Sequence, residues 1–159
     1  LHSFTMKISN LFKYIFLLSL IPGCGFKVVN QSELINFTLS NISTTGDNRI
    51  GYIIKNKLMI YSKNNKSNVI DLNVDLKKTK TIKERNIKNE ITKFEIYLNA
   101  SIEYQSNKNG KFVITKNGSY TVSNRYSQTL NSEKKLIKTL SESIADDIVD
   151  ELILRANDF

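Results

Sequence analysis

The chain has 159 residues, of which 40% are hydrophobic and 24% charged, and its formal net charge is +8. These values indicate one globular domain and exclude collagen-like, proline-rich and wholly disordered classes. The single cysteine excludes an internal disulfide and a cysteine-rich zinc site, and the single histidine, His2, lies ahead of the expected domain. The composition therefore disfavours histidine-dependent enzymes, while the positive charge favours an anionic partner: a nucleic acid, an anionic membrane surface or a phosphorylated glycolipid.

The first 23 residues have the pattern of a secretory signal peptide. Met6 is the expected start of translation, Lys7 and Lys13 supply a positive region, and Tyr14–Ile21 forms a short apolar region. That apolar stretch is far shorter than the ~20 residues that a membrane-spanning helix needs. Residues 1–23 are therefore expected to direct export and to be removed.

The only cysteine follows the apolar region directly, in the stretch Ile21-Pro22-Gly23-Cys24-Gly25. A small residue before a cysteine at this place resembles the lipobox of bacterial lipoproteins. The resemblance implies cleavage after Gly23 and acyl chains, such as palmitate, on Cys24. Several acyl chains, at ~0.8 kcal/mol per buried methylene, anchor a protein firmly in a membrane. Glycine after the cysteine resembles the outer-membrane sorting signal. An ordinary secretory signal and a buried cysteine are the alternatives.

Residues 24–32 are expected to form a lipidated tether and residues 33–159 one domain. Removal of residues 1–23 leaves a net charge of +6. Within the domain, hydrophobic residues recur with period two in four segments, which predicts strands, and at helical spacing in two segments. The predicted elements, in chain order, are strand 34–42, helix 47–63, strand 69–81, strand 92–104, strand 112–126 and helix 132–156.

This order, β-α-β-β-β-α, predicts an α+β fold: a two-layer sandwich with a four-stranded, mostly antiparallel sheet and two helices on one face. The first two strands are expected to be parallel because a helix connects them, and the remaining strands form a meander. Both helices are expected on the same face because each strand offers only one apolar face. A hairpin turn is expected at 107–110 and a β-bulge at Gly118.

Basic residues concentrate around the hairpin between the second and third strands. Residues 24–132 carry a net charge of +9, whereas residues 133–159 carry −3. One interpretation is a docking site for phosphates, where lysines act as point charges and Arg85 can bind bidentately. The other is that lysines keep an exposed hairpin soluble. The densest run comprises Lys77, Lys78, Lys80, Lys83, Arg85, Lys88 and Lys93.

Several short segments of the mature chain carry a family resemblance through their order and spacing. They are Cys24-Gly25-Phe26, the predicted helix segment Arg49–Leu58, Asn109–Val113, Gly118–Tyr120, Arg125–Ser127, Ser143–Ile148 and Leu152–Leu154. Together with the lipobox, these segments resemble LptE, the lipopolysaccharide-assembly lipoprotein family, in its alphaproteobacterial form. The resemblance covers essentially the whole mature chain.

The resemblance implies a protein of the outer membrane that faces the periplasm. Members plug the LptD β-barrel, help to assemble it, and bind lipopolysaccharide during its delivery to the outer leaflet. They are not enzymes, so no catalytic residue, metal or cofactor is implied beyond the lipid on Cys24. The implied partners are an LptD-like barrel, lipopolysaccharide and the membrane. The candidate lipopolysaccharide-binding residues, chosen by position, are Lys77, Lys78, Lys80, Lys83 and Arg85, followed by Lys111, Lys116 and Arg125.

Three other interpretations stay open. The chain could be a structural lipoprotein that binds another envelope protein and no glycolipid. A nucleic-acid-binding module would suit the pI of about 9.5 and the tyrosines, but export removes that partner. An enzyme could use Asp146-Asp147 and Asp150-Glu151 as metal ligands, although at helical spacing these residues are typical of a solvated helix face.

Overall fold

The computed structural model describes residues 37–63 and 68–155. The predicted signal peptide, Cys24 and the tether lie outside these residues. The elements are β1 (Phe37–Gly46), α3 (Asn48–Leu58), the short 3₁₀ helix η1 (Tyr61–Lys63), β2 (Asn68–Arg85), β3 (Ile91–Gln105), β4 (Gly110–Thr121) and α4 (Tyr126–Arg155). The predicted order β-α-β-β-β-α is confirmed.

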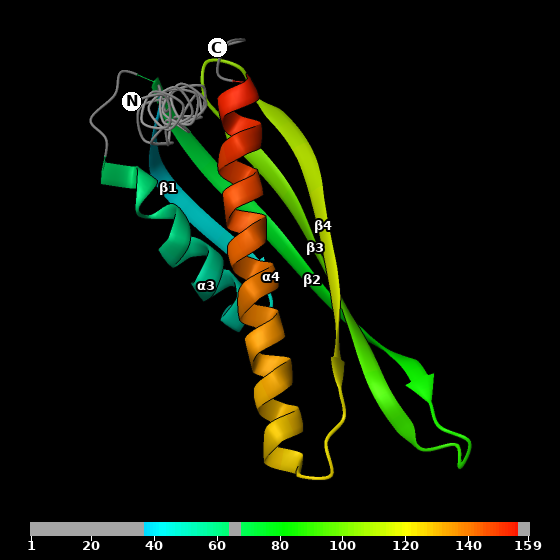
Figure 1. Ribbon diagram of the computed structural model, residues 1–159. Helices are drawn as coiled ribbons and strands as arrows, with labels where there is room; N and C mark the ends of the chain where they lie inside the picture. Colours follow the sequence, from blue (N-terminus) through cyan, green and yellow to red (C-terminus); the bar gives the residue numbers. More distant parts are fainter. Residues whose placement is uncertain (1–36, 64–67, 156–159) are drawn as a thin grey trace, which may run out of the picture. The chain divides into compact units, whose positions relative to one another are not determined.

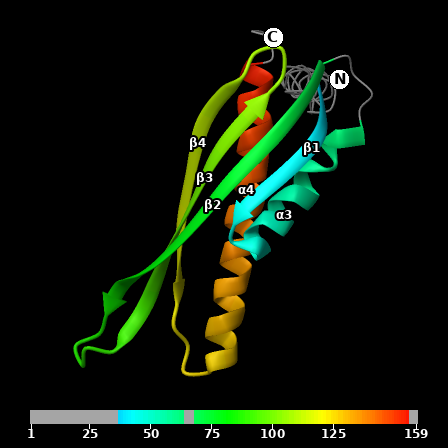
Figure 2. The same cartoon turned by 180° about the vertical axis from the view of Figure 1, so that it is seen from behind.

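The strands form one four-stranded sheet in the order β1-β2-β3-β4. β1 and β2 are parallel, and the β2–β3 and β3–β4 pairs are antiparallel. α3 and α4 lie on the same face of the sheet, and none of the described helices lies on the other face, here termed the open face (Figures 1 and 2). The mixed sheet and the two helices of the predicted two-layer α+β fold are therefore confirmed.

The core lies between the sheet and the helices. In β2 the even-numbered residues from Ile70 to Leu76 are buried, and in β3 those from Ile96 to Tyr104 are buried, because alternate side chains of a strand point to opposite faces. The helices meet them with buried residues at helical spacing, among them Ile50, Ile54 and Leu58 of α3 and Ile144, Ile148 and Leu152 of α4. Each such side chain contributes ~1.5–3 kcal/mol when it is fully buried.

The bounds of five elements differ from the prediction by more than one residue. β2 continues to Arg85 instead of residue 81, and β4 ends at Thr121 instead of residue 126. The other three are β1, α3 and α4. β1 continues through the predicted turn to Gly46, because Thr44, Thr45 and Gly46 pair with β2 residues 74–76. α3 ends at Leu58, and the residues that follow form a turn and η1. α4 begins at Tyr126, well before the predicted residue 132. Its first two turns contain only two large apolar residues, Tyr126 and Leu130, which are too few to form a stripe that predicts a helix.

The predicted bulge at Gly118 is wrong. The β3–β4 register runs without a shift, and Gly118 pairs with Ile96. A Cβ atom at Gly118 would lie 2.7 Å from Cδ1 of Leu136, so the glycine instead makes room for α4 against the sheet. The register shifts occur elsewhere: in β1 between Leu39 and Ile42, and in β2 between Ile82 and Glu84.

Candidate functional site

The basic residues of the β2–β3 hairpin lie on two faces of the sheet. Lys78 and Lys80 continue the alternation of the buried residue Leu76, so they lie on the face that the helices cover. Lys77 has the opposite parity and lies on the open face. Lys83 follows the register shift after Ile82 and also lies on the open face, where its side chain reaches Glu95. The hairpin therefore does not present its lysines as one patch.

Lys78 is bound to the residue that begins α3. Its Nζ lies 2.8 Å from Oδ2 of Asp47. The other oxygen of that carboxylate accepts hydrogen bonds from the backbone N–H groups of Arg49 at 3.1 Å and Ile50 at 3.2 Å, which is the geometry of a helix N-cap. The hydrogen bond from Lys78 is the main cause that lowers the pKa of Asp47. Lys78 thus supports the attachment of α3 to the sheet.

Lys80 is bound to α4 in the same manner. Its Nζ lies 2.7 Å from Oε2 of Glu133, and the hydroxyl of Tyr120 donates to the same oxygen at 2.6 Å. The ammonium also lies over the rings of Phe94 and Tyr120, 4.3 and 5.3 Å from their centroids. Burial disfavours both charged forms. The mutual hydrogen bonds outweigh it, so the pKa of Lys80 is raised and the pKa of Glu133 is lowered.

The two candidate lysines of β4 also have carboxylate partners. Lys116 lies on the helix-covered face, where its Nζ is 2.6 Å from Oδ2 of Asp147 in α4. Lys111 lies on the open face, 2.8 Å from Oε1 of its cross-strand neighbour Glu103. Both residues therefore contribute to contacts within the domain.

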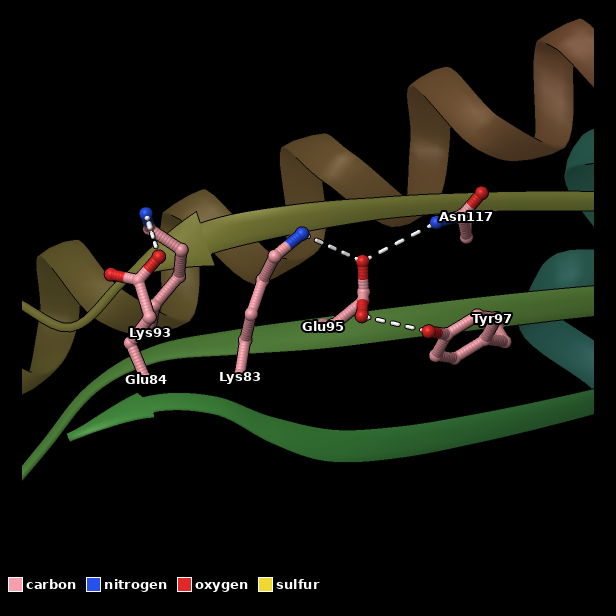
Figure 3. Close-up of polar contacts among 6 residues, drawn as sticks. All are labelled: Lys83, Glu84, Lys93, Glu95, Tyr97 and Asn117. Carbon is pink, nitrogen blue, oxygen red and sulfur yellow. Dashed lines mark hydrogen bonds and ion pairs between the residues drawn. The ribbon is translucent and has the colours of Figure 1, made fainter.

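A polar network on the open face holds the end of the hairpin in register (Figure 3). Glu95 accepts hydrogen bonds from Lys83 at 2.8 Å, from the Tyr97 hydroxyl at 2.7 Å and from Asn117 at 3.3 Å. Beside it, Lys93 and Glu84 form an ion pair at 2.7 Å. The bond from Lys83, followed by that from Tyr97, lowers the pKa of Glu95, and the same carboxylate raises the pKa of Tyr97. The network joins β2, β3 and β4.

Three of the eight candidate residues have no carboxylate partner among the residues that the structure describes: Lys77, Arg85 and Arg125. Arg85 donates to the backbone carbonyl of Asn89 at 2.8 Å, inside the hairpin turn. Arg125 is exposed in the connection between β4 and α4. These three cations can meet an external anion without the loss of an ion pair.

Sequence reasoning missed the acidic partners Asp47, Glu133 and Asp147. No local signal could reveal Glu133, which is 53 residues from Lys80 and meets it only because α4 crosses the sheet there. The acidic run of α4 has the same explanation, since Asp146 pairs with Lys57 at 3.2 Å and Asp147 with Lys116. Within the described ranges, no group of three or more His, Cys, Asp or Glu residues is placed to hold a metal ion, and no helix is long and apolar enough to cross a membrane.

The fold is similar to those of solved bacterial lipoproteins. The rare lipoprotein B from Shewanella oneidensis matches with a TM-score of 0.61 and 12% identity, over 76% of this chain and 98% of that one. Lipoprotein B from Nitrosomonas europaea matches with a TM-score of 0.59 and 13% identity, over 84% and 93%. A minor lipoprotein from Acinetobacter baumannii matches with a TM-score of 0.54 and 15% identity, over 77% and 94%.

These likenesses establish a shared fold that spans nearly the whole length of the three lipoproteins. No protein-family model and no curated protein matches the sequence.

Proposed function

We propose that this chain is an outer-membrane lipoprotein of the LptE type, anchored through Cys24, that plugs and helps to assemble an LptD-like β-barrel and binds lipopolysaccharide during its delivery to the outer leaflet. The observation that carries the proposal is the conjunction of a lipobox at Cys24 with a fold shared, almost end to end, with rare lipoprotein B and related bacterial lipoproteins.

The surface of the sheet suits the proposed position inside a barrel. The open face carries many Asp, Asn, Thr, Ser and Lys side chains, and several of them are cross-strand neighbours: Thr45 pairs with Asp75, Asp75 with Ser101, and Asn99 with Thr115. The wide barrels of outer membranes have polar, hydrated interiors. A plug whose core lies between sheet and helices and whose open sheet face is largely polar is compatible with such a lumen.

We propose that lipopolysaccharide is bound by the three candidate residues that have no carboxylate partner among the described residues. Lys77, Arg85 and Arg125 can approach lipid phosphates at no cost in internal ion pairs, and arginine can bind a phosphate bidentately. Lys78, Lys80, Lys83, Lys111 and Lys116 would each have to leave a carboxylate first. This division narrows the set of residues to be tested.

The number of basic residues that already have carboxylate partners favours a second candidate function. Because five of the eight basic residues are neutralised within the domain, the chain could serve as a structural lipoprotein that binds another envelope protein and no glycolipid. The two functions differ in one measurable property, which is affinity for lipopolysaccharide.

Affinity capture tests the barrel partner. The tagged full chain is captured from detergent-solubilised outer membranes of its own host, and a tagged unrelated outer-membrane lipoprotein serves as the control. We expect a large β-barrel protein in roughly equal amount that stays bound in high salt, since salt weakens exposed charge contacts far more than a buried interface. Absence of a barrel from the captured material would contradict the plug assignment.

A matched pair of triple variants tests the glycolipid. In the site variant, Lys77, Arg85 and Arg125 become Gln; in the control, Lys55, Lys134 and Lys135, also exposed, become Gln, so that both lose three positive charges. We expect the site variant of the full chain to bind purified lipopolysaccharide about tenfold or more weakly, because charge-assisted hydrogen bonds contribute ~1.5–3 kcal/mol each, and the control to stay within about twofold. Undiminished binding by the site variant, or no binding by the wild type, favours the second candidate function.

A further inference from the structure

A cleft lies between the β2–β3 hairpin and the first turns of α4. Figure 1 shows these two elements diverging at that end of the sheet. The cleft has a volume of about 440 Å³ and draws its walls from four places: β2, β3, the β4–α4 connection and α4. This volume lies within the ~300–1,000 Å³ that small-molecule sites occupy. The cleft is lined by apolar residues and by the ion pair of Lys80 and Glu133, together with the polar residues Ser123, Asn124 and Thr129; the apolar ones are Phe94, Val122, Tyr126 and Leu130.

The walls of the cleft are mostly apolar. Phe94, Val122, Tyr126 and Leu130 each contribute to the lining, and Tyr126 is 80% exposed. Ile82 pairs with Phe94 across the hairpin and is 45% exposed, so it extends the apolar surface along the same face. Covering water-exposed apolar surface of this kind with an apolar group is favourable by roughly 25 cal/mol per Å² of surface buried.

The two charged lining residues neutralise each other. Lys80 and Glu133 form the ion pair described above, and Tyr120 donates to the same carboxylate. An apolar ligand in the cleft would thus cover a hydrogen-bonded ion pair. The desolvation of such a pair costs far less free energy than the burial of an unpaired charge.

Backbone and side-chain hydrogen bonds fix the β4–α4 connection, which lines one side of the cleft. The N–H of Val122 donates to the carbonyl of Thr92 at 2.8 Å, and the N–H of Ser123 donates to Oγ1 of Thr129 at 2.8 Å. Arg125 lies between two lining residues, is exposed, and has no ion pair within the described part of the chain. The first turn of α4 carries no acidic residue. A largely apolar cleft thus has an exposed cation, Arg125, next to its lining residues in the chain.

We propose that this cleft binds one acyl chain of lipopolysaccharide, with Arg125 beside the phosphorylated headgroup. The inference rests on the proposed function, because lipopolysaccharide is the anionic amphiphile that it supplies. It adds a site for the apolar part of the ligand, built from Phe94, Val122, Tyr126 and Leu130. Cations on the hairpin alone would recognise only the phosphates.

Photocrosslinking of the full chain tests the site. A photoreactive phenylalanine analogue replaces Tyr126, and the matched control carries it at Tyr52, a tyrosine of α3 that is 68% exposed. The lipidated chain, held in phospholipid nanodiscs, is irradiated with lipopolysaccharide or with deacylated lipopolysaccharide that keeps its phosphates. We expect an adduct at position 126 with intact lipopolysaccharide and none with the deacylated form. After alkaline hydrolysis this adduct should still carry one fatty acid, because the crosslink joins the acyl chain to the protein. No adduct is expected at position 52.

A second pair of variants separates the site from general effects. We expect Leu130→Glu to weaken binding of intact lipopolysaccharide about tenfold, because it places a charge in the apolar wall, and to leave binding of the deacylated form unchanged. Leu154→Glu, at the exposed far end of α4, should change neither. Thermal unfolding checks whether each variant is folded. The adduct at position 126 is an independent test of the site, because it uses a chain in which Leu130 is unchanged.

The outcomes distinguish the two proposals. If the wild type binds intact and deacylated lipopolysaccharide equally and position 126 forms no acyl adduct, the acyl site is refuted while the glycolipid function stands. A phospholipid adduct alone at position 126 overturns the assignment to lipopolysaccharide. If the wild type binds neither form, the glycolipid function and the acyl site fail together.

Discussion

Reversal of the charge at Lys80 is expected to destabilise the domain, whereas the same change at Lys77 is not. The ammonium of Lys80 is bound to Glu133 and lies over two aromatic rings, while Lys77 has no ion pair among the described residues. Because the Lys80 side chain is 37% exposed, its ion pair is assigned the ~0.5–1 kcal/mol of a surface pair. The cation–π contacts add ~0.5–1 kcal/mol. A glutamate at this position would also repel Glu133 by about 1 kcal/mol at a water-like dielectric constant.

The expected loss for Lys80→Glu is therefore about 2–3 kcal/mol, which corresponds to a fall in Tm of roughly 6–15 °C for a domain of this size. Lys77→Glu should stay within about 0.5 kcal/mol of the wild type. Urea unfolding and thermal unfolding of the full chain measure both changes. The double variant Lys80→Glu with Glu133→Lys should recover about two thirds of the loss, because it restores the ion pair and removes the repulsion but does not restore the cation over the rings.

Two results would refute this reasoning. If Lys80→Glu costs no more than Lys77→Glu, the contacts of Lys80 with α4 contribute nothing to stability. If the charge-swapped double variant is as unstable as Lys80→Glu alone, the loss comes from packing and not from charge. In either case Lys80 would return to the set of cations available to an external phosphate.

Three further predictions concern α3, β1 and the lipid anchor. Asp47→Ala should cost about 1–2 kcal/mol in urea unfolding, because it removes a helix N-cap and the partner of Lys78. Since folding lowers the pKa of Asp47, the advantage of the wild type over Asp47→Asn should be complete above about pH 3.8 and fade as the pH falls through the lower, folded-state value; a constant difference down to pH 2 would contradict this. Gly46→Ala should cost at least about 3 kcal/mol, because φ is +91° and the new Cβ would lie 2.0 Å from the carbonyl oxygen of Leu76; an unchanged urea midpoint would show that the chain relaxes freely there. Cys24→Ser should abolish incorporation of labelled palmitate in cells, and label retained by that variant would place the lipid elsewhere.

The layers of the fold could be predicted because hydrophobic periodicity reports which side of an element is buried. Ile70, Leu72, Val74 and Leu76 alternate with polar residues, and Ile144, Ile148 and Leu152 recur at helical spacing, so both the element types and the shared face of the helices followed. Element ends were less predictable. The first two turns of α4 carry only Tyr126 and Leu130 as large apolar residues, and the contact of Gly118 with Leu136 depends on how two distant segments pack.

For the candidate site, too, local features could be predicted from the sequence and long-range contacts could not. The parity that predicts Leu76 as buried also places Lys78 and Lys80 on the helix side, so their separation from Lys77 was available from the sequence. Their acidic partners were not. Glu133 meets Lys80 and Asp147 meets Lys116 only through the path that α4 takes over the sheet, a long-range packing arrangement that no local pattern records.

The end of the β2–β3 hairpin extends beyond the other elements that the structure describes. Residues 77–90 are all exposed, β4 pairs with β3 no further than Lys93, and the segment from Ile82 to Ile91 is held by two strands alone. Such a ribbon can open locally without unfolding the core. Its backbone amides should therefore exchange hydrogen at a rate that core variants leave unaltered, while those of Ile70–Leu76 exchange only through global unfolding. We therefore expect the hairpin end and the core of the described domain to open separately, and a partner that orders the ribbon to slow exchange there without a change in the stability of the core.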